Sequence, residues 1–157
     1  MTGKKLELGR AAPRFTLPAS GALTWKLQDQ AGRNLVLYFY PRDNTPGCTQ
    51  EGIEFRDLYP AFAKARTGIV GLSPDSVASH DKFIAKMQFP FLLLADTDRT
   101  VCKLFDVIRE KSMYGKKYLG VERSTFLIDA KGMLRAEWRK VKVKGHAQEV
   151  LAAAQAL

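Results

Sequence analysis

Short apolar runs alternate along this chain with segments of helical periodicity, and this alternation restricts the possible folds more than any other feature. Apolar runs of strand length occupy residues 35–40, 67–73 and 91–96. Helical patterns follow them at residues 46–66, 75–88 and 98–107. Alternating strands and helices are typical of a sheet covered by helices on both faces. The sequence therefore predicts an α/β fold with a mixed central β-sheet.

The helix expected over residues 46–66 has the clearest apolar stripe. Phe55, Leu58, Tyr59 and Phe62 recur at helical spacing, while Pro60 predicts a kink or a break near Tyr59. Near the C-terminus, residues 122–141 have strand character on both sides of a turn at 129–132, which predicts a hairpin. A final helix is expected over residues 146–155.

Length and composition favour one ordinary globular domain over residues 1–157. The chain has 157 residues, of which 46% are apolar and 26% are charged. No apolar run approaches the length of a membrane span, and the N-terminus lacks the apolar core of a secretion signal. We therefore expect a cytoplasmic protein that does not bind membranes.

The formal net charge of +9 permits contact with polyanions without requiring it. Lys140, Lys142 and Lys144 alternate with Val141 and Val143, which predicts a strand with one solvated face. No aromatic side chains interleave these lysines, as they do in many surfaces that bind single-stranded nucleic acid. We favour the solvated strand, and a basic nucleic-acid-binding protein stays as the non-enzyme alternative.

The chain has two cysteines and two histidines, and their spacing contains no close pair of metal ligands. Two distant cysteines also do not resemble the disulfide framework of a small secreted protein. We expect free thiols, no metal site and no cofactor.

Cys48 lies where a strand gives way to a helix, at the sheet edge where reactive groups of α/β folds usually gather. Thr45 is a good N-cap residue and Pro46 suits the first helical position, which makes Cys48 the third residue of the helix. The positive end of the helix dipole favours a thiolate there. The helical spacing places Cys48 on the side of the Phe55–Phe62 stripe. A buried structural cysteine is the alternative interpretation.

The spacing of Pro41, Thr45 and Cys48 matches the pattern Pro-x-x-x-Thr-x-x-Cys of peroxiredoxins. The segments APRFTL, GLSPDS, FLLLADTD and ERSTFLIDAKG extend the likeness over nearly the whole chain, which resembles the peroxiredoxin Q or bacterioferritin comigratory protein subfamily. The resemblance implies a thioredoxin-like fold, a monomer, and reduction of hydrogen peroxide or organic hydroperoxides by Cys48.

The same resemblance implies the roles of the other site residues. The Thr45 hydroxyl and the Cys48 backbone N–H would bind the peroxide oxygens, Arg123 would supply positive charge, and Pro41 would shield the sulfur from water. A free thiol of pKa ~8.5 is already about 3% thiolate at pH 7, so thiolate formation alone gains at most roughly 30-fold. Stabilisation of the departing oxygen must supply the rest. Glu51 either orients Arg123 or is a plain solvated helix residue.

Oxidation would leave Cys48 as a sulfenic acid that another thiol must reduce. Members of the subfamily carry a resolving cysteine at positions where this chain has Ile53 or Ile84. Cys102 is therefore the only internal candidate, and its alternative is a buried structural role. We favour a one-cysteine mechanism, with glutathione and glutaredoxin or thioredoxin as the external reductant, over a Cys48–Cys102 disulfide.

Two other enzyme classes fit the residues less well. A thioredoxin-type oxidoreductase needs a Cys-x-x-Cys pair, and Thr45 stands where its first cysteine would fall. A cysteine hydrolase needs a histidine base, and neither His80 nor His146 lies in a recognisable motif.

Overall fold

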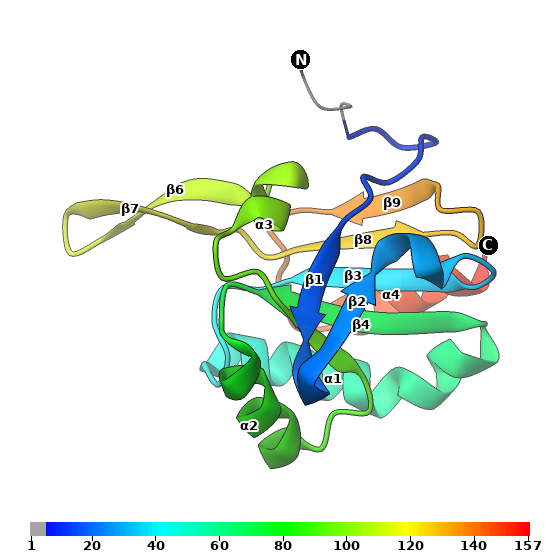
Figure 1. The fold of residues 1–157 in the computed structure, drawn as a ribbon, viewed down its shortest axis with the longest axis horizontal. Helices are drawn as coiled ribbons and strands as arrows, with labels where there is room; N and C mark the ends of the chain where they lie inside the picture. The colour runs from blue at the N-terminus through cyan, green and yellow to red at the C-terminus, as the bar shows by residue number, and fades with distance from the viewer. Residues whose placement is uncertain (1–5) are drawn as a thin grey trace.

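The computed structural model describes residues 6–157, so residues 1–5 of the expected domain lie outside the described range. A seven-stranded mixed sheet forms the centre of the molecule, in the strand order β2-β1-β5-β4-β3-β8-β9 (Figure 1). Its strands are β1 (Thr16–Ala19), β2 (Leu23–Lys26), β3 (Asn34–Phe39), β4 (Thr67–Ser73), β5 (Leu92–Ala95), β8 (Ser124–Ile128) and β9 (Leu134–Trp138). The central strands β3, β4 and β5 are parallel, and the outer strands pair antiparallel. The predicted α/β fold with a mixed sheet is confirmed.

The sheet separates two apolar cores because alternate side chains of each strand point to opposite faces. Along β3, Leu35, Leu37 and Phe39 belong to one core, and Val36 and Tyr38 belong to the other. Burial on both faces explains why β3 is a continuous apolar run instead of an alternating one.

Four α-helices cover the two faces. They are α1 (Pro46–Lys64), α2 (Val77–Met87), α3 (Thr100–Leu104) and α4 (His146–Gln155). Side chains of α1, α2 and α4 pack into the core that contains Tyr38, whereas α3 packs into the core that contains Phe39. Within residues 6–157, no helix combines the length and apolar character needed to cross a membrane.

Helix α1 continues through Pro60, so the expected break near Tyr59 is wrong. Phe55 and Phe62, on either side of the proline, are both fully buried. Their burial stabilises the helix on the sheet, and we infer that this packing outweighs the backbone hydrogen bond that proline removes.

The basic stretch 140–144 is not a strand, because β9 ends at Trp138 and Lys140 has a positive φ of 48°. A non-glycine residue in this conformation interrupts an extended chain. The expected alternation of exposure persists without the strand, since the three lysines are exposed while Val141 and Val143 are half-buried.

A second hairpin was not predicted from the sequence. Strands β6 (Ile108–Met113) and β7 (Lys116–Val121) form a separate two-stranded sheet that extends away from the body of the molecule (Figure 1). The connecting residues Tyr114 and Gly115 both have positive φ, as a two-residue hairpin turn requires. The Tyr-Gly pair was the sequence signal, but the flanking strands bury too little to show an apolar pattern.

Candidate active site

Cys48 lies in the first turn of α1, just beyond the carboxyl end of β3, and its side chain is 2% exposed. It belongs to the same core as Phe55 and Phe62, as the helical spacing predicted. Thr45 occupies the N-cap position, but its hydroxyl does not cap the helix. That hydroxyl instead donates to the Arg42 carbonyl at 2.9 Å, which corrects the expected capping role.

Arg123 approaches the sulfur from the segment between β7 and β8. Its Nη2 lies 3.4 Å from Cys48 Sγ, and its Nη1 donates to Glu51 Oε1 at 2.6 Å. A Cβ atom on Gly47 would lie 3.1 Å from the same Nη2, so the glycine leaves room for the guanidinium. The fold thus places a cation, held by a carboxylate, directly against the thiol.

Glu51 is 1% exposed, and its Oε2 has no hydrogen-bond partner among the described residues. Burial raises the pKa of this carboxyl to about 7, although the ion pair with Arg123 opposes the shift. Arg123 keeps a raised pKa beside Glu51 and Cys48 in spite of its own burial. The guanidinium therefore stays charged while Glu51 titrates near neutral pH. Of the two interpretations of Glu51, contact with Arg123 is the one that the geometry supports.

Glu51→Gln should change how stability depends on pH. A carboxyl whose pKa rises from 4.5 to about 7 on folding binds more protons when folded, so the free energy of unfolding falls as pH rises through that range. The wild type should lose up to about 3 kcal/mol relative to the variant between pH 4.5 and 7. Urea unfolding of both proteins at several pH values measures this difference. Parallel pH profiles would contradict it.

A buried polar network fixes the loop that precedes Cys48. Asp43 accepts hydrogen bonds from Tyr40 Oη at 2.6 Å and Ser79 Oγ at 2.7 Å, and its Oδ2 lies 2.7 Å from His80 Nδ1. The other ring nitrogen of His80 lies 2.8 Å from the Leu94 carbonyl. Both His80 nitrogens are thus engaged away from Cys48, which argues against a hydrolase base. An isolated histidine on a helix was the one sequence signal for this network.

The other histidine is also engaged elsewhere. His146 Nε2 lies 2.8 Å from Thr125 Oγ1, and burial lowers the pKa of the imidazole to about 4. This neutral, partnered imidazole at the start of α4 packs edge-on against the Phe55 ring instead.

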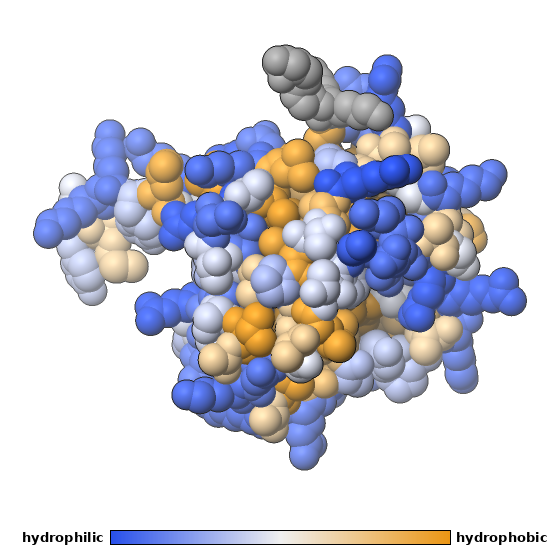
Figure 2. Space-filling view, viewed as in Figure 1, coloured by the Kyte–Doolittle hydropathy of each residue, from blue (hydrophilic) through white to orange (hydrophobic). Residues whose placement is uncertain are grey.

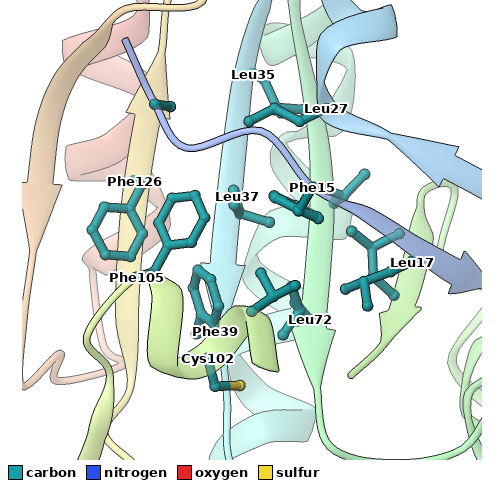
Figure 3. Packing of buried hydrophobic residues seen from close by; sticks show 14 of the residues in the cluster. Phe15, Leu17, Leu27, Leu35, Leu37, Phe39, Leu72, Cys102, Phe105 and Phe126 are labelled. Carbon is teal, nitrogen blue, oxygen red and sulfur yellow. The ribbon is translucent and has the colours of Figure 1, made fainter. Parts of the chain in front are cut away.

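Cys102 lies on the opposite face of the sheet from Cys48. It is fully buried in the core of Phe39 and Phe105, and Figure 3 shows its side chain projecting from the short helix α3. Burial and neighbouring Asp96 raise the pKa of its thiol well above the ordinary value. The Cys102 backbone N–H donates to Asp96 Oδ2 at 2.7 Å. Both cysteines are free thiols.

Pro41 lies half-buried at the end of β3 and lines the same groove as Thr45. Among the described residues, no group of three or more potential metal-ligating side chains comes together. The site is therefore built from a buried thiol, a hydroxyl, backbone N–H groups and one paired guanidinium. Such a set can activate a sulfur nucleophile and bind a small polar molecule.

Comparisons with known proteins agree with this chemistry. The model of the AhpC/TSA family matches residues 8–137. The peroxiredoxin Bcp of Xanthomonas campestris pv. campestris is 53% identical over 156 residues, which make up 99% of this chain and 98% of the relative.

Solved structures extend the likeness to three dimensions. A Xanthomonas campestris peroxiredoxin Q structure has a TM-score of 0.87 at 54% identity and covers 90% of each chain. A cysteine-to-serine mutant of Xylella fastidiosa peroxiredoxin Q has a TM-score of 0.91 at 46% identity and covers 98% of each chain. The predicted thioredoxin-like fold is confirmed by these likenesses.

Proposed function

Because this chain belongs to the AhpC/TSA family and is a thiol-dependent peroxidase, we propose that Cys48 attacks the peroxide and that an external thiol recycles it. The observation that carries this proposal is the contact of Arg123 Nη2 with Cys48 Sγ at 3.4 Å. A Xanthomonas campestris relative has been studied for its alkyl peroxide reduction activity, which supports organic hydroperoxides as substrates beside hydrogen peroxide.

In the proposed reaction the Cys48 thiolate attacks one peroxide oxygen. A sulfur–oxygen bond forms, the O–O bond breaks, and the departing oxygen takes a proton to leave as water or an alcohol. Negative charge moves from sulfur to the departing oxygen, so a fixed cation beside both atoms stabilises the transition state. Arg123 fills this role, with Glu51 holding its guanidinium in place. The Thr45 hydroxyl and the Cys48 N–H bind the peroxide, and Pro41 shields the sulfur.

A one-cysteine cycle fits the positions of the two sulfurs. Cys48 and Cys102 pack into different cores on opposite faces of the sheet. A disulfide needs Cα atoms within about 7 Å and Cβ atoms directed toward each other. Joining these cysteines would require the chain to carry one of them around or through the sheet. For the Xanthomonas campestris relative, structures of serine mutants at two different cysteines have been solved. This chain has isoleucine at both positions, 53 and 84, where the subfamily resemblance would place a second cysteine.

Mass spectrometry after one equivalent of hydrogen peroxide tests both the activity and the cycle. Wild type and Cys102→Ser should each gain one oxygen atom, and dimedone should trap the sulfenic acid at Cys48 in both. Burial and the raised pKa of Cys102 keep that thiol from reacting. A loss of two hydrogens in the wild type alone would instead establish a Cys48–Cys102 disulfide.

The same proposal includes a reductant, a cellular location and an oligomeric state. We expect glutathione with glutaredoxin, or thioredoxin, to reduce the oxidised thiol in the cytoplasm, and we expect the enzyme to act as a monomer. Size-exclusion chromatography with light scattering measures the molar mass before and after oxidation and so tests whether the enzyme is a monomer in both states.

A further inference from the structure

The β6–β7 hairpin exposes a concentration of large apolar side chains beside basic ones. Met113, Tyr114, Tyr118 and Leu119 are 44–98% exposed. Figure 2 shows apolar surface among strongly hydrophilic side chains on this projecting hairpin. Several large exposed apolar side chains on one short hairpin favour an interaction surface.

A groove of about 930 Å³ lies between this hairpin and the loop that precedes Cys48. Its charged lining side chains are all cationic: Arg42, Arg99, Lys111, Lys116 and Lys117. Among the described residues, no acidic side chain lines the groove. The groove therefore favours a ligand that carries negative charge.

The groove borders the loop that leads into Cys48. Pro41 and Thr45, which belong to the loop before Cys48, form part of its wall. Lys111, on the opposite wall, has its pKa lowered by burial and by Arg123, while Cys48 opposes that shift. A molecule in the groove therefore lies against the loop that leads into Cys48.

The volume of the groove and the burial of Cys48 favour a small ligand. Cys48 is 2% exposed, so a small molecule reaches its sulfur more readily than the flat surface of a folded protein, which would need α1 to open first. Sites for small molecules typically enclose about 300–1,000 Å³ and combine apolar walls with a few charged groups. The groove has these properties.

We propose that the hairpin groove binds a small anionic thiol that reduces the oxidised Cys48, an inference that rests on the proposed one-cysteine cycle. The thiol sulfur attacks the Cys48 sulfenic sulfur, an S–S bond forms, and the S–O bond breaks as hydroxide takes the thiol proton and leaves as water. A second thiol molecule then attacks the mixed disulfide and releases the Cys48 thiol with a small-molecule disulfide. Two thiols are oxidised for each peroxide reduced.

The cationic lining assists this step in two ways. It concentrates anionic carriers near the sulfur. It also favours the thiolate form of the incoming thiol, which is the form that attacks.

A charge series of small thiols tests the proposal. Wild type is oxidised with one equivalent of hydrogen peroxide and mixed with thioglycolate, 2-mercaptoethanol or cysteamine, and formation of the mixed disulfide is timed by quench and mass spectrometry. Rate constants are expressed per thiolate to remove differences in thiol pKa. We expect the order anionic, neutral, cationic, with the anionic advantage shrinking as salt is added.

The double variant Arg42→Gln/Lys116→Gln removes two exposed cations from the groove. It should lower the rate with thioglycolate, relative to mercaptoethanol, by about 5- to 20-fold. The matched control Lys64→Gln/Lys131→Gln removes the same charge near the C-terminal end of α1 and in the turn before β9, and should keep the wild-type ratio.

Equal rates for the three thiols, or equal ratios in the two double variants, would overturn the proposal. Reduction by a thioredoxin-type protein alone, with none of the small thiols reacting, would overturn it as well. Failure of hydrogen peroxide to oxidise Cys48 in the wild type is a different result, because it would refute the proposed function before any thiol is added.

Discussion

Cys48→Ser should reduce peroxide no faster than buffer alone, whether hydrogen peroxide or an organic hydroperoxide is supplied with dithiothreitol. A serine hydroxyl stays protonated at neutral pH and has no adjacent base, since His80 and His146 both have other partners. Peroxide consumption over time measures the loss.

Cys102→Ser is the matched control, because it makes the same sulfur-to-oxygen change at the other buried cysteine. It should keep the wild-type rate with a small thiol reductant. Residual peroxidase activity in Cys48→Ser, removed by changing Cys102 as well, would show that the wrong sulfur has been assigned.

Arg123→Lys should slow the oxidation of Cys48 by about 10²- to 10³-fold, the usual cost of losing one preorganised donor at a site of developing charge. A lysine keeps the charge but lacks the planar fork that contacts Cys48 Sγ and Glu51 Oε1 together. Stopped-flow fluorescence with hydrogen peroxide gives the rate constant.

Arg135→Lys is the control for this prediction, since Arg135 pairs with Asp129 on the surface and lies outside the site. It should oxidise at the wild-type rate. If Arg123→Lys reacted equally fast, positive charge alone would suffice and the paired geometry would have no part in the chemistry. Circular dichroism of both variants checks that each remains folded.

The sequence was sufficient to predict the part of the fold where local and global signals agree. The apolar run at 35–40 and the stripe of Phe55 and Phe62 correspond to β3 and α1, and the junction between them places Cys48 in the first turn. Here a strand buried on both faces meets an amphipathic helix, and each pattern is strong by itself.

Other features depend on contacts between distant segments. From its residue type alone, Arg123 would be interpreted as an exposed arginine on a strand. Only the resemblance to peroxiredoxins predicted that it lies beside Cys48. Thr45 occupies the position expected of a helix cap, but its hydroxyl donates to the Arg42 carbonyl and does not cap the helix. The β6–β7 hairpin was not predicted from the sequence because its strands are mostly exposed and therefore lack apolar alternation.

The burial of the two sulfurs in separate cores has a consequence for the lifetime of the enzyme. Cys48 has no second cysteine on its own face of the sheet, so its sulfenic acid persists until an external thiol reacts with it. During that time a second peroxide molecule competes with the thiol for the sulfenic acid and would produce a sulfinic acid that ordinary thiols do not reduce. The number of turnovers before inactivation should therefore follow the ratio of thiol to peroxide in the surroundings, so that reductant supply limits how much peroxide each molecule can remove.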